Sequence, residues 1–271
     1  GDLSNGQIKV AVPKTEQVEL IFNNFTASCN TSAPLYIESA DKATIVLAAG
    51  SVNTLTDATL YQFANPAEDK PNACIYSSDD MTIKGTGTLN VNGNYNNGIG
   101  CKNDLRIKDC TLNVTAVNNI LKGNDSVEIE NATVKLSGGE DAIKSDTADR
   151  TDKGYILITA GSKVEINCID DAIQATMSIT VEAGCTVTGA IMDEAPDRCL
   201  GVLVGKNEGE VSNGEETLAA VKLLTGSAGS QNSQDQVSGL SAILRLELGT
   251  DRKIGIAGQT AAKDVDKTMI W

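Results

Sequence analysis

Apolar and polar residues alternate along much of this chain in short segments that recur at a nearly constant interval. Three segments begin at Ile75, Ile99 and Leu121, and in each the sixth and eighth residues after the start are again apolar, with a polar residue between them. Looser copies begin at Ile143 and Ile173. Alternation with period two places one set of side chains inside and the other in solvent, as in a β-strand. The pattern therefore predicts a strand that recurs once per repeat.

Each repeat carries a second apolar pair, after a short turn rich in Gly, Asn and Asp. These pairs are Leu89 and Val91, Leu112 and Val114, Val134 and Leu136, and Val164 and Ile166. A unit of about 22–24 residues cannot bury its own apolar face, so consecutive units must stack. We predict an all-β fold, a right-handed single-stranded parallel β-helix. A helical alternative is disfavoured because no i, i+3, i+4 apolar stripe is sustained.

The repeat pattern extends toward the N-terminus and is interrupted at two places. The segment Ile37–Ile45 fits the same pattern, and the wide interval before the next start predicts a protruding loop near residues 61–72. A polar insertion at residues 146–153 predicts a second loop. The register is lost beyond Gly205.

The loss of register divides the chain into two parts. We predict a β-helix domain over residues 1–205, followed by an irregular C-terminal extension or cap over residues 206–271. This second part would pack on the same solenoid and could include a late coil. A cap is needed because an open end coil exposes unpaired strand backbone and apolar core.

Composition excludes several classes of function. The net charge of −14 argues against a nucleic-acid partner. The absence of histidine removes Ser-His-Asp hydrolysis and histidine-dependent zinc sites. Aromatic residues make up 3% of the chain and offer little material for a flat platform that stacks neutral sugars. No apolar run reaches the roughly 18 residues of a membrane span.

The seven cysteines are an odd number, so at least one must be unpaired. A free cysteine behaves by default as a small buried hydrophobe. We expect buried structural cysteines, with a disulfide or a reactive role as the alternative.

Stacking the repeats places polar residues in two columns. The first column follows each start by four residues, with Asp80 and Asp104 one position further on, and consists of Asp41, Asp79, Asn103 and Asp125. The second precedes each start and consists of Asn96-Asn97, Asn118-Asn119, Glu140-Asp141, Asp170-Asp171 and Asp197-Arg198. Asp and Asn commonly cap turns and form side-chain ladders. For the first column we favour this structural interpretation.

In the second column, four carboxylates fall on two adjacent coils, about 4.8 Å apart. Calcium takes roughly six to eight oxygen ligands. We therefore treat Glu140, Asp141, Asp170 and Asp171 as candidate calcium ligands, and an ordinary turn ladder remains an equal alternative. Calcium would also let an acidic protein bind an acidic polysaccharide, because the cation bridges the carboxylates of both.

Two lysines lie beside the second column. Lys122 and Lys144 each follow a start by one residue and could hold a uronate carboxylate, with Asn97 and Asn119 as further candidate substrate-binding residues. In a lyase, one of these lysines would remove the proton α to the substrate carboxylate while calcium acidifies that carbon. The alternative is that both lysines form salt bridges with flanking carboxylates.

Three runs of the sequence, residues 43–57, 71–83 and 85–99, resemble the secreted bacterial carbohydrate-binding β-helix proteins of the domain-of-unknown-function 4353 type. The resemblance covers roughly residues 18–190. The Asp-Gly-Ile corner of that family appears here as Asn97-Gly98-Ile99, Asp141-Ala142-Ile143 and Asp171-Ala172-Ile173, and in degraded form as Asn119-Ile120-Leu121 and Arg198-Cys199-Leu200.

This resemblance implies an architecture similar to that of calcium-dependent pectate lyases and a role in binding plant polysaccharides, acidic ones included. It implies an extracellular or cell-surface protein. The chain begins at Gly1 with no signal peptide, so a leader peptide or lipid anchor could have been removed.

Three hypotheses follow. The first is a monomeric, calcium-assisted protein that binds polysaccharide, with an acidic plant or microbial glycan such as polygalacturonate as its partner. The second is a calcium-dependent polysaccharide lyase that acts by β-elimination. The third is a structural or adhesive surface solenoid without a sugar ligand.

Overall fold

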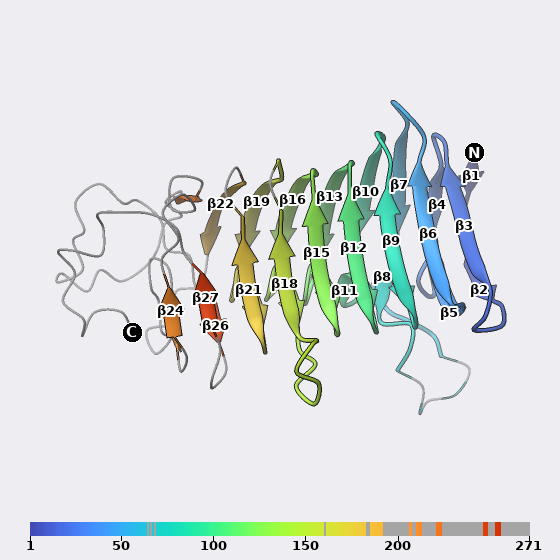
Figure 1. Cartoon of the computed structure of the whole chain (residues 1–271). Coiled ribbons are helices and arrows are strands. Elements are labelled where there is room, and N and C mark those ends of the chain that lie inside the picture. Colours follow the sequence, from blue (N-terminus) through green and yellow to red (C-terminus); the bar gives the residue numbers. More distant parts are fainter. Residues whose placement is uncertain are drawn as a thin grey trace.

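The computed structural model describes residues 1–191 except 64, 66, 68, 160, 183 and 184, the backbone alone for residues 189–191, and five short strands between residues 206 and 255. Within this part of the chain every regular element is a β-strand, and the strands form three sheets in which all pairs are parallel. The coils stack side by side along one axis (Figure 1). The prediction of a parallel β-helix is confirmed.

Sheet B contains the repeat starts. Its strands, in order of pairing, are β2 (Ile8–Ala11), β5 (Leu35–Ser39), β8 (Ala73–Ser77), β11 (Asn97–Cys101), β14 (Leu121–Gly123), β17 (Ile143–Ser145), β20 (Ile173–Ala175), β26 (Leu246–Leu248) and β23 (Lys206–Asn207). The five starts are register partners across the sheet, from Ile75 through Ile99, Leu121 and Ile143 to Ile173. All five side chains are buried.

Sheet C contains the first apolar pair of each repeat. Its strands are β24 (Glu210–Ser212), β27 (Lys253–Gly255), β21 (Ser178–Val181), β18 (Tyr155–Ile158), β15 (Ser126–Glu130), β12 (Asp104–Lys108), β9 (Asp80–Lys84), β6 (Lys42–Leu47) and β3 (Gln17–Phe22). One inward column stacks Ile83, Ile107, Ile129 and Ile158 in register, each fully buried. Burial of such a side chain contributes about 1.5–3 kcal/mol, so each added coil extends the core.

Sheet A contains the second apolar pair. Its strands are β1 (Asp2–Leu3), β4 (Thr26–Ser28), β7 (Val52–Thr56), β10 (Thr88–Asn92), β13 (Thr111–Ala116), β16 (Thr133–Gly138), β19 (Lys163–Cys168), β22 (Thr186–Ile191) and β25 (Val221–Leu223). The core lies between the three sheets, and the six described cysteines are all buried and unpaired. The expectation of a free packed thiol is confirmed, and Cys199 lies outside the described residues.

The three corners differ in length. Between sheets C and A the turn is tight and uses left-handed residues, φ 56° at Asp109 and 46° at Asn131, which Asn and Asp adopt more readily than most residues. The corner from sheet A to sheet B, here the A–B corner, carries the predicted loop before β8. The corner from sheet B to sheet C, the B–C corner, carries the predicted insertion before β18. Both loops protrude from the solenoid (Figure 1).

Most of the predicted C-terminal extension lies outside the described residues, so its boundary at residue 205 stays a prediction. Within the described part of the chain, no helix is long and apolar enough to cross a membrane.

Candidate functional site

The second polar column becomes a buried side-chain ladder at the A–B corner, where the chain turns into sheet B. Asn97, Asn119, Asp141 and Asp171 stack on consecutive coils and all are buried. The backbone N–H and Nδ2 of Asn119 donate to Asn97 Oδ1 at 3.1 and 2.9 Å. The backbone N–H of Asp171 donates to Asp141 Oδ1 at 3.2 Å. These bonds satisfy backbone groups that the turn leaves unpaired, so the ladder has a structural role.

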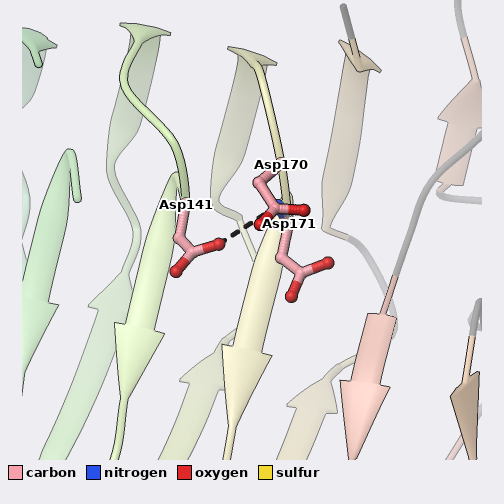
Figure 2. Close-up of side chains that lie close together, drawn as sticks. All are labelled: Asp141, Asp170 and Asp171. Atoms are coloured by element: carbon pink, nitrogen blue, oxygen red, sulfur yellow. Dashed lines mark hydrogen bonds between the residues drawn. The ribbon is translucent and has the colours of Figure 1, made fainter. Parts of the chain in front are cut away.

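The last two described coils of the ladder carry a cluster of three carboxylates, which we call the acidic group; the next pair of the column, Asp197-Arg198, lies outside the described residues. The acidic group consists of Asp141, Asp170 and Asp171, and one carboxylate oxygen from each lies within 4.8 Å of the others. Figure 2 shows Asp141 on one coil and the other two residues on the next. Glu140, the fourth candidate ligand, is exposed and lies outside the group. Two oxygens bound to one calcium are at most about 5 Å apart, and the acidic group meets this limit.

Two side chains on sheet B donate to the acidic group. Lys144 Nζ donates to Asp141 Oδ2 at 2.8 Å, and the neutral Gln174 Nε2 donates to Asp171 Oδ2 at 2.8 Å. Burial and then the charges of the three carboxylates raise the pKa of Cys168 to about 12, so its thiol adds no negative charge. Two carboxylates at this spacing repel by about 3 kcal/mol at an effective dielectric constant of 20. A bound cation would remove that cost.

One further oxygen at this corner lacks a donor. Asn119 Oδ1 is buried and has no hydrogen-bond partner among the described residues. Its residue lies one coil away from Asp141, because Ile120 N donates to Asp141 O at 2.9 Å. A buried oxygen without a donor normally costs about 1–3 kcal/mol. The acidic group itself offers only oxygen donors, of the kind that calcium prefers, so the residues present fit this cation.

The two candidate lysines are register partners on the outer face of sheet B. Lys122 Nζ lies 2.6 Å from Asp146 Oδ2, and Lys144 Nζ lies 2.8 Å from Asp141 Oδ2. The alternative interpretation, salt bridges with flanking carboxylates, is confirmed. Both ammonium groups are paired with carboxylates, whereas a general base must be free to accept a proton.

The candidate substrate-binding asparagines are not at the surface. Asn97 is 4% exposed and Asn119 is 7% exposed, and their amides are used within the ladder. They shape the corner that presents the acidic group. Gln174, which the sequence reasoning missed, follows the start Ile173 by one residue, as the two lysines follow theirs, and is the register partner of Lys144. Its position in the repeat, one residue after the start, could have identified Gln174 from the sequence.

The first polar column lies at the B–C corner, and three of its carboxylates pair with cations. These pairs join Lys14 to Asp79 at 2.8 Å, Lys153 to Asp104 at 2.7 Å and Arg150 to Asp125 at 3.6 Å. Burial lowers the pKa of Lys153, but the hydrogen bond to Asp104 and the charges of Asp104 and Asp125 outweigh this and raise it. Hydroxyl donors add to the column, since Thr147 Oγ1 donates to Asp125 Oδ1 at 2.9 Å. The turn interpretation of this column fits these contacts.

An aromatic cluster, which the sequence reasoning also missed, lies in the loop before β8. Tyr61 stacks on Tyr95 with ring centroids 4.0 Å apart, and Phe63 lies 6.1 Å from Tyr61. The Tyr61 hydroxyl donates to Asp57 Oδ2 at 2.7 Å, and burial raises the pKa of Asp57. No repeat position marks these residues, because the loop interrupts the repeat.

Comparison with known proteins places the chain in a family. A family model described as carbohydrate-binding domain-containing protein matches residues 1–246. The chain belongs to that family. A carbohydrate-binding domain-containing protein from Acetivibrio thermocellus is 45% identical over 181 residues, which is 67% of this chain and 63% of that protein. The match therefore spans less than two thirds of the relative.

A solved structure supports the same placement. It is a polysaccharide lyase-like protein from C. thermocellum, determined as a gadolinium derivative. It matches with a TM-score of 0.68 and 42% identity, covering 71% of this chain and 77% of that one. The expected resemblance to carbohydrate-binding β-helices with a lyase-like architecture is thereby confirmed at the level of the family and the fold.

Proposed function

We propose that this protein binds an acidic polysaccharide of the polygalacturonate type, with calcium held by the acidic group. Membership of a carbohydrate-binding family supports the general class of ligand. The observation that carries the finer proposal is the cluster of Asp141, Asp170 and Asp171, which brings one carboxylate oxygen from each residue within 4.8 Å of the others.

Charge explains why a cation is needed. A protein with net charge −14 repels a polyanion, so binding is favoured where the negative charge is neutralised locally. Calcium at the acidic group would supply two positive charges and open coordination positions for uronate oxygens.

The lysines on sheet B extend this site. Lys144 is shared between Asp141 and the solvent, and Lys122 lies one coil further along the same face. Binding of calcium to the acidic group would weaken the hold of Asp141 on Lys144. The released ammonium group could then pair with a uronate carboxylate of the same polysaccharide chain.

We place this activity outside the cell or at its surface, where polymeric glycan is encountered, and in a monomeric protein. A lyase would need Lys122 or Lys144 as a base, and both form ion pairs with carboxylates, so this geometry favours binding over β-elimination.

Calorimetric titration of polygalacturonate tests the proposal, first with millimolar calcium and then with excess chelator, while the absorbance of unsaturated uronate is followed. We expect heat that depends on calcium, without a rise in absorbance. Heat with rising absorbance would make the protein a lyase. No heat in either condition would contradict the acidic-polysaccharide proposal and favour the structural solenoid.

A further inference from the structure

Exposed apolar side chains gather at the A–B corner, beside the acidic group. In the described part of the chain the large apolar side chains that are most exposed are Ile21, Val52, Leu60, Val117 and Ile169. Leu60, Val117 and Ile169 belong to the A–B corner. Single exposed apolar residues are common on any protein, but residues aligned on one corner require an explanation.

Two of them occupy equivalent positions on the solenoid. The backbone N–H of Val117 donates to Asn96 O at 3.1 Å, and that of Ile169 donates to Gly139 O at 3.0 Å. Val117, Gly139 and Ile169 thus hold the same corner position in three consecutive coils. Val117 and Ile169 are therefore about 10 Å apart along the axis, at about 4.8 Å per coil.

The residue between them cannot carry a side chain. Gly139 has φ +69°, and a Cβ atom there would lie 2.3 Å from Asn118 O and 2.7 Å from Ile120 Cγ1. The surface between the exposed side chains of Val117 and Ile169 therefore carries no side chain. We call Val117, Gly139 and Ile169 the corner strip.

A row of polar side chains runs parallel to the corner strip, one residue further along each coil. Its members are Asn118, Glu140 and Asp170, linked by backbone hydrogen bonds of 2.9 and 2.8 Å from one coil to the next. Asp170 also belongs to the acidic group, so the strip is continuous with the proposed calcium site. The corner therefore offers apolar contacts on one side and hydrogen-bonding groups on the other.

Sugar rings present the matching surface, because a pyranose has apolar C–H faces and hydroxyl groups along its edges. We propose that the polysaccharide lies lengthwise along the A–B corner, with ring faces against Val117 and Ile169 across Gly139 and hydroxyl groups against Asn118, Glu140 and Asp170. This inference rests on the proposed function and specifies where the chain of sugars runs. A protein partner suits the corner less well, because charged residues are depleted at the centre of protein interfaces.

Matched variants test the corner strip. Val117 and Val52 are both 55% exposed, and Ile169 and Ile21 are 45% and 67% exposed, so Val52 and Ile21 provide controls away from the corner. We compare Val117→Ser/Ile169→Ser with Val52→Ser/Ile21→Ser in calorimetric titrations of polygalacturonate at millimolar calcium. The corner variant should bind at least about tenfold more weakly than the wild type, whereas the control variant should stay within about twofold.

The possible failures are distinguishable. Wild-type binding with equal affinities for both double variants would overturn the corner strip and leave the proposed function standing. Absence of wild-type binding would overturn both.

Analytical ultracentrifugation provides a further test, because a wild-type dimer that the corner variant converts to a monomer would assign the strip to self-association. Calcium titration without sugar should give the same affinity for all three proteins, and a loss in the corner variant alone would show that the substitutions disturb the acidic group.

Discussion

The two long corners of the solenoid both carry acidic columns, but they balance this charge differently. At the B–C corner, cations from other parts of the chain reach the carboxylates. Lys14 is 65 residues from its partner Asp79, and Lys153 is 49 residues from Asp104. At the A–B corner, Lys144 pairs with Asp141 from only three residues away, and three carboxylates lie close together. A carboxylate column thus suggests a cation site where carboxylate oxygens converge, and this comparison can be tested corner by corner.

The largest expected difference between the corners concerns polysaccharide binding. Asp141→Asn/Asp170→Asn keeps the shape of the acidic group but removes two of its charges. We expect the affinity for polygalacturonate at millimolar calcium to fall by about 100-fold, because calcium binds through carboxylate charge. The matched control is Asp104→Asn/Asp125→Asn at the other corner. Similar losses in the two variants, measured by calorimetry, would remove the distinction between the corners.

The second difference concerns stability, and here we expect the larger loss at the B–C corner. Asp125 accepts a hydrogen bond from Thr147 and faces Arg150 and Lys153. Asp125→Ala should lower the free energy of unfolding by about 2 kcal/mol, because the Thr147 hydroxyl loses its acceptor and Arg150 and Lys153 each lose one of their two carboxylate partners. Asp170→Ala should change it little, or raise it, in the presence of chelator, because it relieves repulsion.

Urea unfolding followed by circular dichroism measures both variants. A larger loss of stability in Asp170→Ala than in Asp125→Ala would mean that the acidic group is a structural element, and that its carboxylates stabilise the corner without a cation.

The smallest expected effect is a pH dependence of the B–C corner. The folded protein raises the pKa of Lys153, as described above. The stabilisation by Lys153 is therefore fully present below the unfolded pKa of about 10.4 and is lost as the pH rises through the folded pKa. The difference in unfolding free energy between the wild type and Lys153→Met should be constant up to about pH 10 and shrink above it, by on the order of 1 kcal/mol or less. A difference that grows with alkaline pH would show that this ion pair has been assigned wrongly.

Much of the fold could be predicted because every coil repeats the same spacing of buried apolar residues. Residues such as Ile99 and Leu121 mark a buried position whose register partner is the next start, so the stacking order follows from the sequence. The loops before β8 and β18 were visible as interruptions of that spacing. The boundary at residue 205 is a prediction that the described residues do not test.

The candidate site was only partly predictable. The spacing of the repeats brought Asp141, Asp170 and Asp171 together correctly, because a column follows from the same register as the core. The sequence could not show that Glu140 is exposed, since orientation at a turn depends on local backbone. Nor could it pair Lys153 with Asp104, because that contact requires the insertion loop to fold back across two coils. The Tyr61–Tyr95 stack was missed for the same reason, as it joins a loop to a coil outside the repeat.

Calcium titration without polysaccharide tests the central claim most directly, with the wild type, Asp170→Asn and Asp125→Asn compared by calorimetry. We expect the wild type and Asp125→Asn to bind calcium with the same affinity, and Asp170→Asn to bind it at least about tenfold more weakly. Equal binding by all three proteins, or a loss confined to Asp125→Asn, would contradict the assignment of the cation site to the A–B corner.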